Sequence, residues 1–281
     1  MLSFVDLFKI EGFSIEENKI YSFLLDKINI NCPACKGDTF FTMKKFNLRC
    51  KLCRKDFNPL SKTFLGKLKI SYGKWLMILK LFELSVSARE TGRQVGISYP
   101  TILKAYDLIR LAIIKELSKK DELLKKEVEC DESYFGGRRK GNRGRGAAGK
   151  TIVFGILERK GIVNVSIVPD VKSETLMNET VKKVRRGSIV YTDQWKGYNS
   201  LMFCGYKHLK INHEHKFKQG KVYINGVEGF WSYAKERLIK HHGISKKKFL
   251  LYIKEQEWRY NNKNKNLYEI LIHIMLGDNS L

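Results

Sequence analysis

Features that define whole classes of proteins are missing from this 281-residue chain. It has no apolar run of about eighteen residues, so no transmembrane helix is predicted. Its first residues, MLSFVDLFKIEGFSIEE, lack the basic-then-apolar order of a signal peptide, and we expect an intracellular protein. Acidic residues are also scarce, because 29 Asp and Glu stand against 53 Lys and Arg.

The resulting excess of positive charge narrows the choice of partners. A formal net charge of +24 and a pI of about 9.7 are typical of proteins that bind a polyanion, most often nucleic acid. An anionic membrane surface and a ribosomal-type structural role are the alternatives. With 43% hydrophobic and 12% aromatic residues the chain has the composition of a folded protein. Its length allows a core-bearing domain with one or two small modules.

Two CxxC pairs, CPAC and CKLC, lie near the N-terminus and enclose residues 36–49. This spacing is typical of a zinc ribbon, in which four thiolates hold one structural Zn²⁺. The enclosed segment alternates apolar and basic residues and predicts a β-hairpin. Disulfides are the alternative, which an intracellular location disfavours. Cys130 and Cys204 stand alone and are predicted to be unreactive, buried thiols. The predicted zinc ligands are Cys32, Cys35, Cys50 and Cys53.

A helix-turn-helix is predicted next. A helix over residues 71–84 is followed by a short helix ending near Val95, a turn at Gly96 and a second helix capped by Ser98. An ordinary helical hairpin has the same sequence form. The side chains predicted inside the first helix are Trp75, Ile78, Leu79 and Phe82. Those predicted to face DNA are Tyr99, Thr101 and Lys104.

The pattern changes to strands after a charged helix predicted to end near Lys126. Strands are expected over 127–135, 151–161, 162–169, 187–193 and 208–214, and helices over 173–185 and 195–206, the first capped by Ser173. This order predicts an α/β protein with an RNase H-like catalytic domain, a mixed five-stranded sheet flanked by helices. A basic amphipathic helix is expected over 248–265.

A further helix is predicted from Val227 onward, because apolar residues recur at three- and four-residue steps. Glu228 is predicted to lie inside this apolar stripe, where a carboxylate needs a charged partner. Lys235 follows two helical turns later. Alone, the two residues are either a salt bridge or a metal ligand and a phosphate-binding lysine. The stripe consists of Val227, Phe230, Trp231, Ala234 and Leu238.

Two aspartates extend this pattern. In an RNase H-like sheet Asp131, in the first strand, and Asp193, at the end of the fourth, lie side by side, and the helix would bring Glu228 to them. Converging carboxylates need cations, and oxygen-only ligation suits Mg²⁺ or Mn²⁺. Two such ions serve phosphodiester cleavage and transfer. Considered alone, each aspartate has another interpretation: Asp131 could be a strand-end residue, and Asp193 could be a turn residue or a helix cap.

A glycine-rich basic segment precedes the second strand. Residues 144–151, GRGAAGKT, match a phosphate-loop pattern, but a strand follows where that motif requires a helix, so no nucleotide cofactor is expected. We expect a loop that contacts DNA phosphates; a solvated hairpin loop is the alternative. The residues predicted to bind DNA here are Arg138, Arg139, Lys140, Arg143 and Arg145.

Three blocks, ECDESYFGGRRKGNRGRGAAGK, VYTDQWKGY and INGVEGFWSYAKERL, resemble the DDE transposases of the ISXO-like insertion sequences and their eukaryotic Merlin relatives. The resemblance extends to the cysteine pairs. It implies a catalytic domain that cuts element ends and joins them to target DNA with Mg²⁺. Asp131, Asp193 and Glu228 would be its carboxylates and Lys235 its lysine. Some relatives have Asn as the third ligand, and Asn225 occupies that place here.

Two histidines, His213 and His215, also fall in a block that the family shares. A part in the chemistry is one interpretation, and a structural or DNA-facing role is the other. Five regions are predicted: an N-terminal helical segment, a zinc ribbon, a helix-turn-helix region, the catalytic domain and a C-terminal tail or helix. Their bounds are 1–30, 31–60, 61–126, 127–262 and 263–281.

The predicted function is therefore that of a DNA transposase that uses two Mg²⁺ or Mn²⁺ ions and one structural Zn²⁺. An RNase H-like nuclease without strand joining is one alternative. A catalytically inactive DNA-binding regulator is the other. The expected partners are double-stranded DNA, as terminal inverted repeats and target, and further copies of the chain in a dimer or larger assembly. Bacterial cytoplasm or nucleoid and eukaryotic nucleus are both compatible locations.

Overall fold

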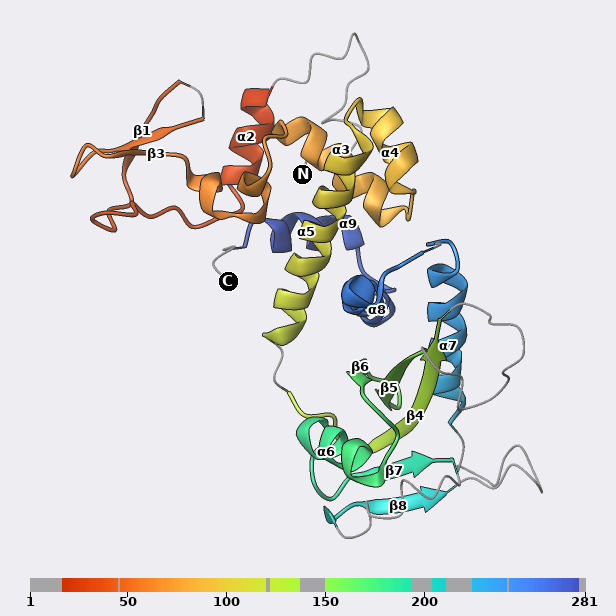
Figure 1. The fold of residues 1–281 in the computed structure, drawn as a ribbon. Coiled ribbons are helices and arrows are strands. Elements are labelled where there is room, and N and C mark those ends of the chain that lie inside the picture. The colour runs from red at the N-terminus through yellow and green to blue at the C-terminus, as the bar shows by residue number, and fades with distance from the viewer. Residues whose placement is uncertain are drawn as a thin grey trace. The chain divides into compact units, whose positions relative to one another are not determined.

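The computed structural model describes residues 17–44, 46–119, 122–136, 150–193, 204–210, 224–241 and 243–277. The chain forms two compact units, Met1–Glu116 with Lys265–Leu281, and Leu117–Asn264 (Figure 1). Across the described residues, no helix has the length and apolar character needed to cross a membrane.

The first unit contains a small antiparallel sheet in the order β1-β2-β3. Strands β1 (Phe40–Thr42) and β2 (Leu48–Cys50) form the predicted hairpin, and β3 (Asp56–Phe57) adds a third strand. Helix α2 (Glu17–Leu25) is tied to the hairpin by Tyr21, whose hydroxyl donates to the Phe46 carbonyl over 2.8 Å.

Helical elements complete this unit. Two 3₁₀-helices, η1 (Pro59–Lys62) and η2 (Phe64–Lys67), precede α3 (Tyr72–Glu83). The Ser71 hydroxyl caps α3 by accepting from the Lys74 N–H. The four side chains predicted to lie inside α3 are all buried, which confirms this prediction. Helix α9 (Leu267–Met275) packs on α3, where Tyr268 donates to the Leu76 carbonyl over 3.3 Å.

The two helices of the predicted helix-turn-helix are present. Helix α4 (Ala88–Val95) ends at Gly96, whose φ of 65° lies in the left-handed region that glycine adopts without strain. Helix α5 (Tyr99–Ser118) begins directly after Ser98. The prediction of a charged helix that ends near Lys126 is wrong, because α5 ends at Ser118. The backbone of Leu124 instead bonds to Lys183 and Arg185 on a neighbouring segment, which is incompatible with a helix there.

The second unit is built on a mixed five-stranded sheet in the order β6-β5-β4-β7-β8. Its first three strands are antiparallel and the last two run parallel to β4. This is the predicted RNase H-like fold. The strands are β4 (Glu127–Phe135), β5 (Thr151–Glu158), β6 (Val163–Val168), β7 (Ile189–Thr192) and β8 (Lys207–Lys210).

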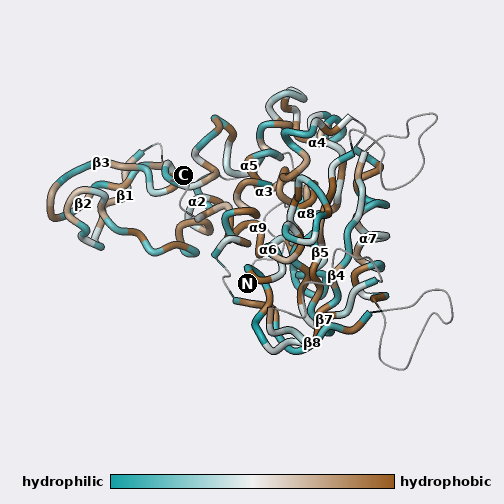
Figure 2. The backbone as a smooth tube through the Cα atoms, turned by 60° about the horizontal axis from the view of Figure 1, so that its bottom comes forward, coloured by the Kyte–Doolittle hydropathy of each residue, from teal (hydrophilic) through white to brown (hydrophobic). Residues whose placement is uncertain are grey.

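Helices cover both faces of this sheet. One core contains α7 (Asn225–Leu238) and α8 (Lys246–Asn261), packed on residues of β4, β5 and β6. The other holds Leu176 of α6 (Ser173–Lys183) with Val128 and Cys130. Strand β5 is mostly hydrophobic because it is buried on both faces (Figure 2).

Several predicted details are settled by these elements. Cys130 is buried as expected, whereas Cys204 is only partly buried. Lys172, not Ser173, is the N-cap of α6, because Ser173 already has helical backbone. Thr151 begins a strand, as the argument against a phosphate loop required. The predicted helix over 195–206 and the strand residues 211–214 fall largely or wholly outside the described residues.

Candidate active site

Asp131 and Asp193 lie at the same height along the neighbouring parallel strands β4 and β7. In the parallel ladder between β4 and β7, Glu129 is opposite Tyr191. Asp131 and Asp193 each follow two residues later, Asp131 within β4 and Asp193 directly after β7. Because side chains alternate along a strand, Asp131 shares the sheet face of Glu129, which is the face that α7 covers.

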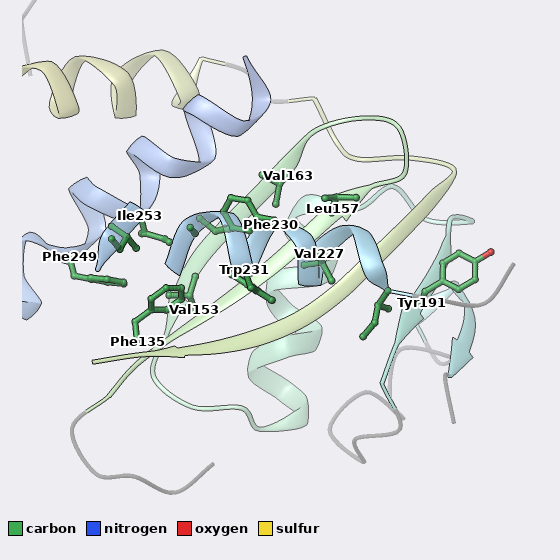
Figure 3. Close-up of a cluster of buried hydrophobic side chains, with 14 residues drawn as sticks. Phe135, Val153, Leu157, Val163, Tyr191, Val227, Phe230, Trp231, Phe249 and Ile253 are labelled. Carbon is green, nitrogen blue, oxygen red and sulfur yellow. The ribbon is translucent and has the colours of Figure 1, made fainter. Parts of the chain in front are cut away.

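Helix α7 holds Asp131 through Trp231. The indole Nε1 donates to Asp131 Oδ2 over 3.0 Å. Gly155, opposite Asp131 in β5, makes room for the indole, since a Cβ there would lie 2.6 Å from Trp231 Cζ2. Figure 3 shows Trp231 and Val227 between the helix and the sheet. The five residues of the predicted apolar stripe on α7 are all buried, as expected.

The electrostatics at Asp131 suit a bound cation. Burial raises the pKa of its carboxyl to about 7, and the negative charges of Glu132 and Asp193 add to the effect. The backbone N–H of Glu132 and the Trp231 indole act in the opposite direction. A partly buried carboxylate beside other acidic groups is the donor set that a hard divalent cation stabilises.

Glu228, Lys235 and Asn225 all lie exposed on α7. The prediction that Glu228 is inside the apolar stripe is wrong, because its helical position is at the border of the buried face, one turn before Trp231. Lys235 Nζ lies 5.9 Å from the centroid of the Phe135 ring, at the end of β4. Asn225 is the first residue of the helix. The carboxylate oxygens of the three predicted metal ligands do not all lie within 4.8 Å of one another. These ligands are Asp131, Asp193 and Glu228.

The four predicted zinc ligands do come together. Their Sγ atoms all lie within 4.8 Å of one another. Sγ of Cys32 is 3.5 Å from that of Cys53, and Sγ of Cys35 is 3.5 Å from that of Cys50. Tetrahedral Zn–S bonds of about 2.3 Å place sulfur atoms roughly 3.8 Å apart, so the quartet fits zinc. Within the described parts of the chain it is the one cluster of this kind.

The residues predicted to face DNA from the helix pair lie at the start of α5. Tyr99 is 45% exposed and Lys104 is exposed, while Thr101 is partly buried. The guanidinium carbon of Arg89, on α4, lies 5.7 Å from the Tyr99 ring centroid. The five basic residues predicted to bind DNA between 138 and 145, and His213 and His215, lie outside the described residues.

The structure also brings in residues that the sequence did not single out. Glu129 is almost fully buried beside α7 and pairs with Arg159. His208 of β8 lies 2.8 Å from the Thr192 hydroxyl, through Nε2. The alternation of β4 was the available signal for Glu129, because it places this residue on the same face as Asp131. No local sequence pattern indicated that His208 of β8 would contact Thr192 of β7.

Comparison with known proteins matches residues 123–261 to the family described as ISXO2-like transposase domain. An uncharacterized transposase-like protein of Haemophilus influenzae is 43% identical over 112 residues, which span 40% of this chain and 91% of that protein. A protein in the transposable element ISH50 of Halobacterium salinarum is 23% identical over 256 residues, 82% of this chain and 85% of its own length.

Solved structures were matched at lower similarity. The catalytic core domain of BIV integrase is 14% identical, with a TM-score of 0.34, over 51% of this chain and 91% of that one. The Mos1 strand transfer complex is 12% identical, with a TM-score of 0.30, over 72% of this chain and 74% of that one.

Proposed function

This chain belongs to the ISXO2-like transposase family, and from that premise we propose that it cleaves the ends of a mobile DNA element and joins them to target DNA. The observation that carries the proposal is the pair of aspartates at the same level of two parallel strands, Asp131 within β4 and Asp193 directly after β7. Asp131 is partly buried and is bonded to helix α7, 100 positions later in the chain. We assign catalysis to residues 127–262, zinc binding to 31–60 and DNA binding to 61–126, with a helical segment over 1–30 and a tail over 263–281.

The metal ions fit this site by its donor chemistry. Asp131, Asp193 and Glu228 would hold two Mg²⁺ or Mn²⁺ ions, with Asn225 as the alternative third ligand. When bound, the ions stabilise charge on the attacking and leaving oxygens of the phosphodiester. Trp231 orients the Asp131 carboxylate through its indole N–H. Lys235, exposed on the same helix, binds a DNA phosphate as a point charge.

Regions outside the catalytic carboxylates also bind the DNA in this proposal. Exposed basic and aromatic residues at the start of α5 contact the element end, and the basic residues between 138 and 145 contact phosphates. The cysteine quartet holds one structural Zn²⁺. Two element ends must meet before they are joined, so the active form is a dimer or larger assembly of this chain.

The test uses the full-length protein with labelled DNA carrying the inverted repeats that flank its gene, in the presence of Mg²⁺. We expect cleavage at the repeat and joining to a second duplex, both lost in Asp193→Asn. Cleavage without joining would indicate a nuclease instead. Binding of the repeat without cleavage would indicate a regulator and overturn the enzymatic proposal.

A second experiment, which compares three variants, identifies the third metal ligand. Glu228→Gln and Asn225→Ala are assayed beside Glu236→Gln, which changes an exposed carboxylate on the same helix. We expect Glu228→Gln to abolish cleavage and Glu236→Gln to retain it. Loss of cleavage in Asn225→Ala with retention in Glu228→Gln would give the third position to Asn225.

A further inference from the structure

Glu129 is a buried carboxylate that the proposed reaction does not use. It lies in β4, two residues before Asp131, and is 1% exposed. Both of its oxygens accept hydrogen bonds. Oε2 accepts the backbone N–H of Val227 over 3.0 Å, and Oε1 accepts Nε–H of Arg159 over 2.9 Å. A carboxylate in such a place is stable only while these donors remain.

Arg159 is itself held in place from several sides. Its Nη1 donates to Glu127 Oε2 over 2.8 Å, and its backbone N–H donates to the Glu127 carbonyl over 2.9 Å. Its guanidinium carbon lies 3.7 Å from the centroid of the Tyr191 ring, which belongs to β7. Arg159, directly after β5, thus contacts both β4 and β7 and presents a fixed positive charge to Glu129.

The bond from Val227 marks the beginning of helix α7. Val227 is the third residue of that helix, and N–H groups in a first turn have no partner within the helix. A carboxylate satisfies such a group and complements the positive end of the helix dipole. Glu129 therefore acts as a helix cap that is supplied by the sheet, about a hundred residues away in the chain.

Gly226 permits this close approach. A Cβ at residue 226 would lie 2.8 Å from Glu129 Oε2 and 3.0 Å from Leu157 Cδ2. These distances are shorter than ordinary contacts, so a larger residue would push the helix start away from the sheet. The side chain of Glu129 and the backbone of α7 meet at one defined position.

We propose that Glu129, with Arg159 behind it, is a positioning residue that sets where α7 begins on the sheet and so places Glu228 and Trp231 relative to Asp131. Glu228 follows Val227 directly and Trp231 comes one turn later, so both move with the helix start. Glu129 touches neither DNA nor metal in this assignment. The inference rests on the proposed function.

The test combines a structural and a kinetic measurement on the full chain. Glu129→Gln keeps an oxygen that can accept from Val227 but removes the negative charge. Gly226→Ala keeps the carboxylate and displaces the helix start. The matched control is Glu255→Gln, because Glu255 and Arg259 on α8 also form a buried ion pair, with Nε to Oε1 at 2.8 Å.

In the kinetic arm, single-turnover cleavage is measured at saturating element-end DNA, together with the Kd for that DNA. We expect both Glu129→Gln and Gly226→Ala to lower the rate about 10- to 100-fold, since displacements of about 1 Å can cost this much. We expect DNA binding to be unchanged and half-saturation to need more Mg²⁺. Glu255→Gln should retain the rate.

In the structural arm, amide hydrogen exchange is followed without metal or DNA. Exchange at residues 225–228 should accelerate in Glu129→Gln, while exchange at the other end of α7 stays unchanged. Unchanged exchange at the helix start would overturn the inference, as would a wild-type cleavage rate in folded Glu129→Gln. A rate loss of the same size in Glu255→Gln would reduce Glu129 to a purely structural role. A wild-type protein that does not cleave DNA overturns the proposed function separately.

Discussion

The indole N–H of Trp231 and the carboxylate of Asp131 are joined by a hydrogen bond of 3.0 Å between Nε1 and Oδ2, across 100 positions of the chain. The bond connects α7 to the central strand at the carboxylate we propose as a metal ligand. The helix and the aspartate are therefore expected to act as one unit.

Trp231→Phe tests this bond. The substitution keeps a ring in the core but removes the donor, and a hydrogen bond to a charged group is worth about 1.5–3 kcal/mol. We expect urea unfolding to show a loss of about this size, and DNA cleavage to fall while DNA binding is retained. The control is Trp75→Phe, because Trp75 Nε1 is buried and has no hydrogen-bond partner among the residues that the structure describes. An equal effect of the two substitutions on stability would contradict the role of the bond.

Gly155→Ala tests the packing between the sheet and α7. The added methyl would lie 2.6 and 2.8 Å from Trp231 Cζ2 and Cη2, so we expect destabilisation of about 1–3 kcal/mol. Gly229→Ala is the matched control, since a Cβ there has no neighbour within 4 Å in the described part of the chain. In the middle of a helix this second change should stabilise the protein by about 0.5–1 kcal/mol. Unfolding midpoints that move in the same direction would contradict the packing argument.

The cysteine quartet predicts bound zinc. Metal analysis of the purified protein should give about one Zn²⁺ per chain, and Cys50→Ser should lose it because tetrahedral structural sites need all four ligands. Cys204→Ser, which changes a cysteine outside the quartet, should keep it. Zinc retained in Cys50→Ser would show that the metal is bound elsewhere.

Lys104→Ala tests the start of α5 as a DNA contact. A lysine that binds a phosphate contributes about one unit to the dependence of log Kd on log salt concentration. We expect weaker binding to element ends and a slope smaller by about 1. Lys172→Ala removes the same charge from an exposed residue that precedes α6. Identical slopes for the two variants would mean that only net charge matters.

His208 predicts a pH dependence of stability. Burial, with a smaller effect of the Lys210 charge, lowers the pKa of its imidazole to about 4. In the unfolded chain the value is about 6.5, so between these values the unfolded state binds more protons. Stability should therefore fall as the pH drops through this window. NMR titration should place the His208 midpoint near 4.

The control for this titration is a variant. His208→Gln should weaken the decline in unfolding free energy between about pH 7 and about pH 5, whereas His273→Gln, at an exposed position on α9, should not. A His208 midpoint at the ordinary value would contradict the prediction.

Much of the fold could be predicted because its signals are local. The strand predicted over 127–135 coincides with β4, and the helix predicted from Ser71 coincides closely with α3. In both segments apolar residues recur at the period of the element, about every 3.6 residues in a helix and every second residue in a strand. This periodicity can be read from a short stretch of sequence. The end of α5 could not be predicted, because a backbone pairing with residues 183 and 185 competes with the helix there.

The candidate site divides in the same way. Motif and spacing alone determined that Asp131, Asp193 and Glu228 are candidate ligands and that four cysteines form a quartet. Only the tertiary structure decided that Glu228 is exposed, that Trp231 bonds to Asp131, and that Glu129 caps α7. These last contacts join residues about a hundred positions apart, and they arise from strand register and helix packing. Strand register and helix packing cannot be read from a short stretch of sequence, because both depend on the free energy of the whole packed domain.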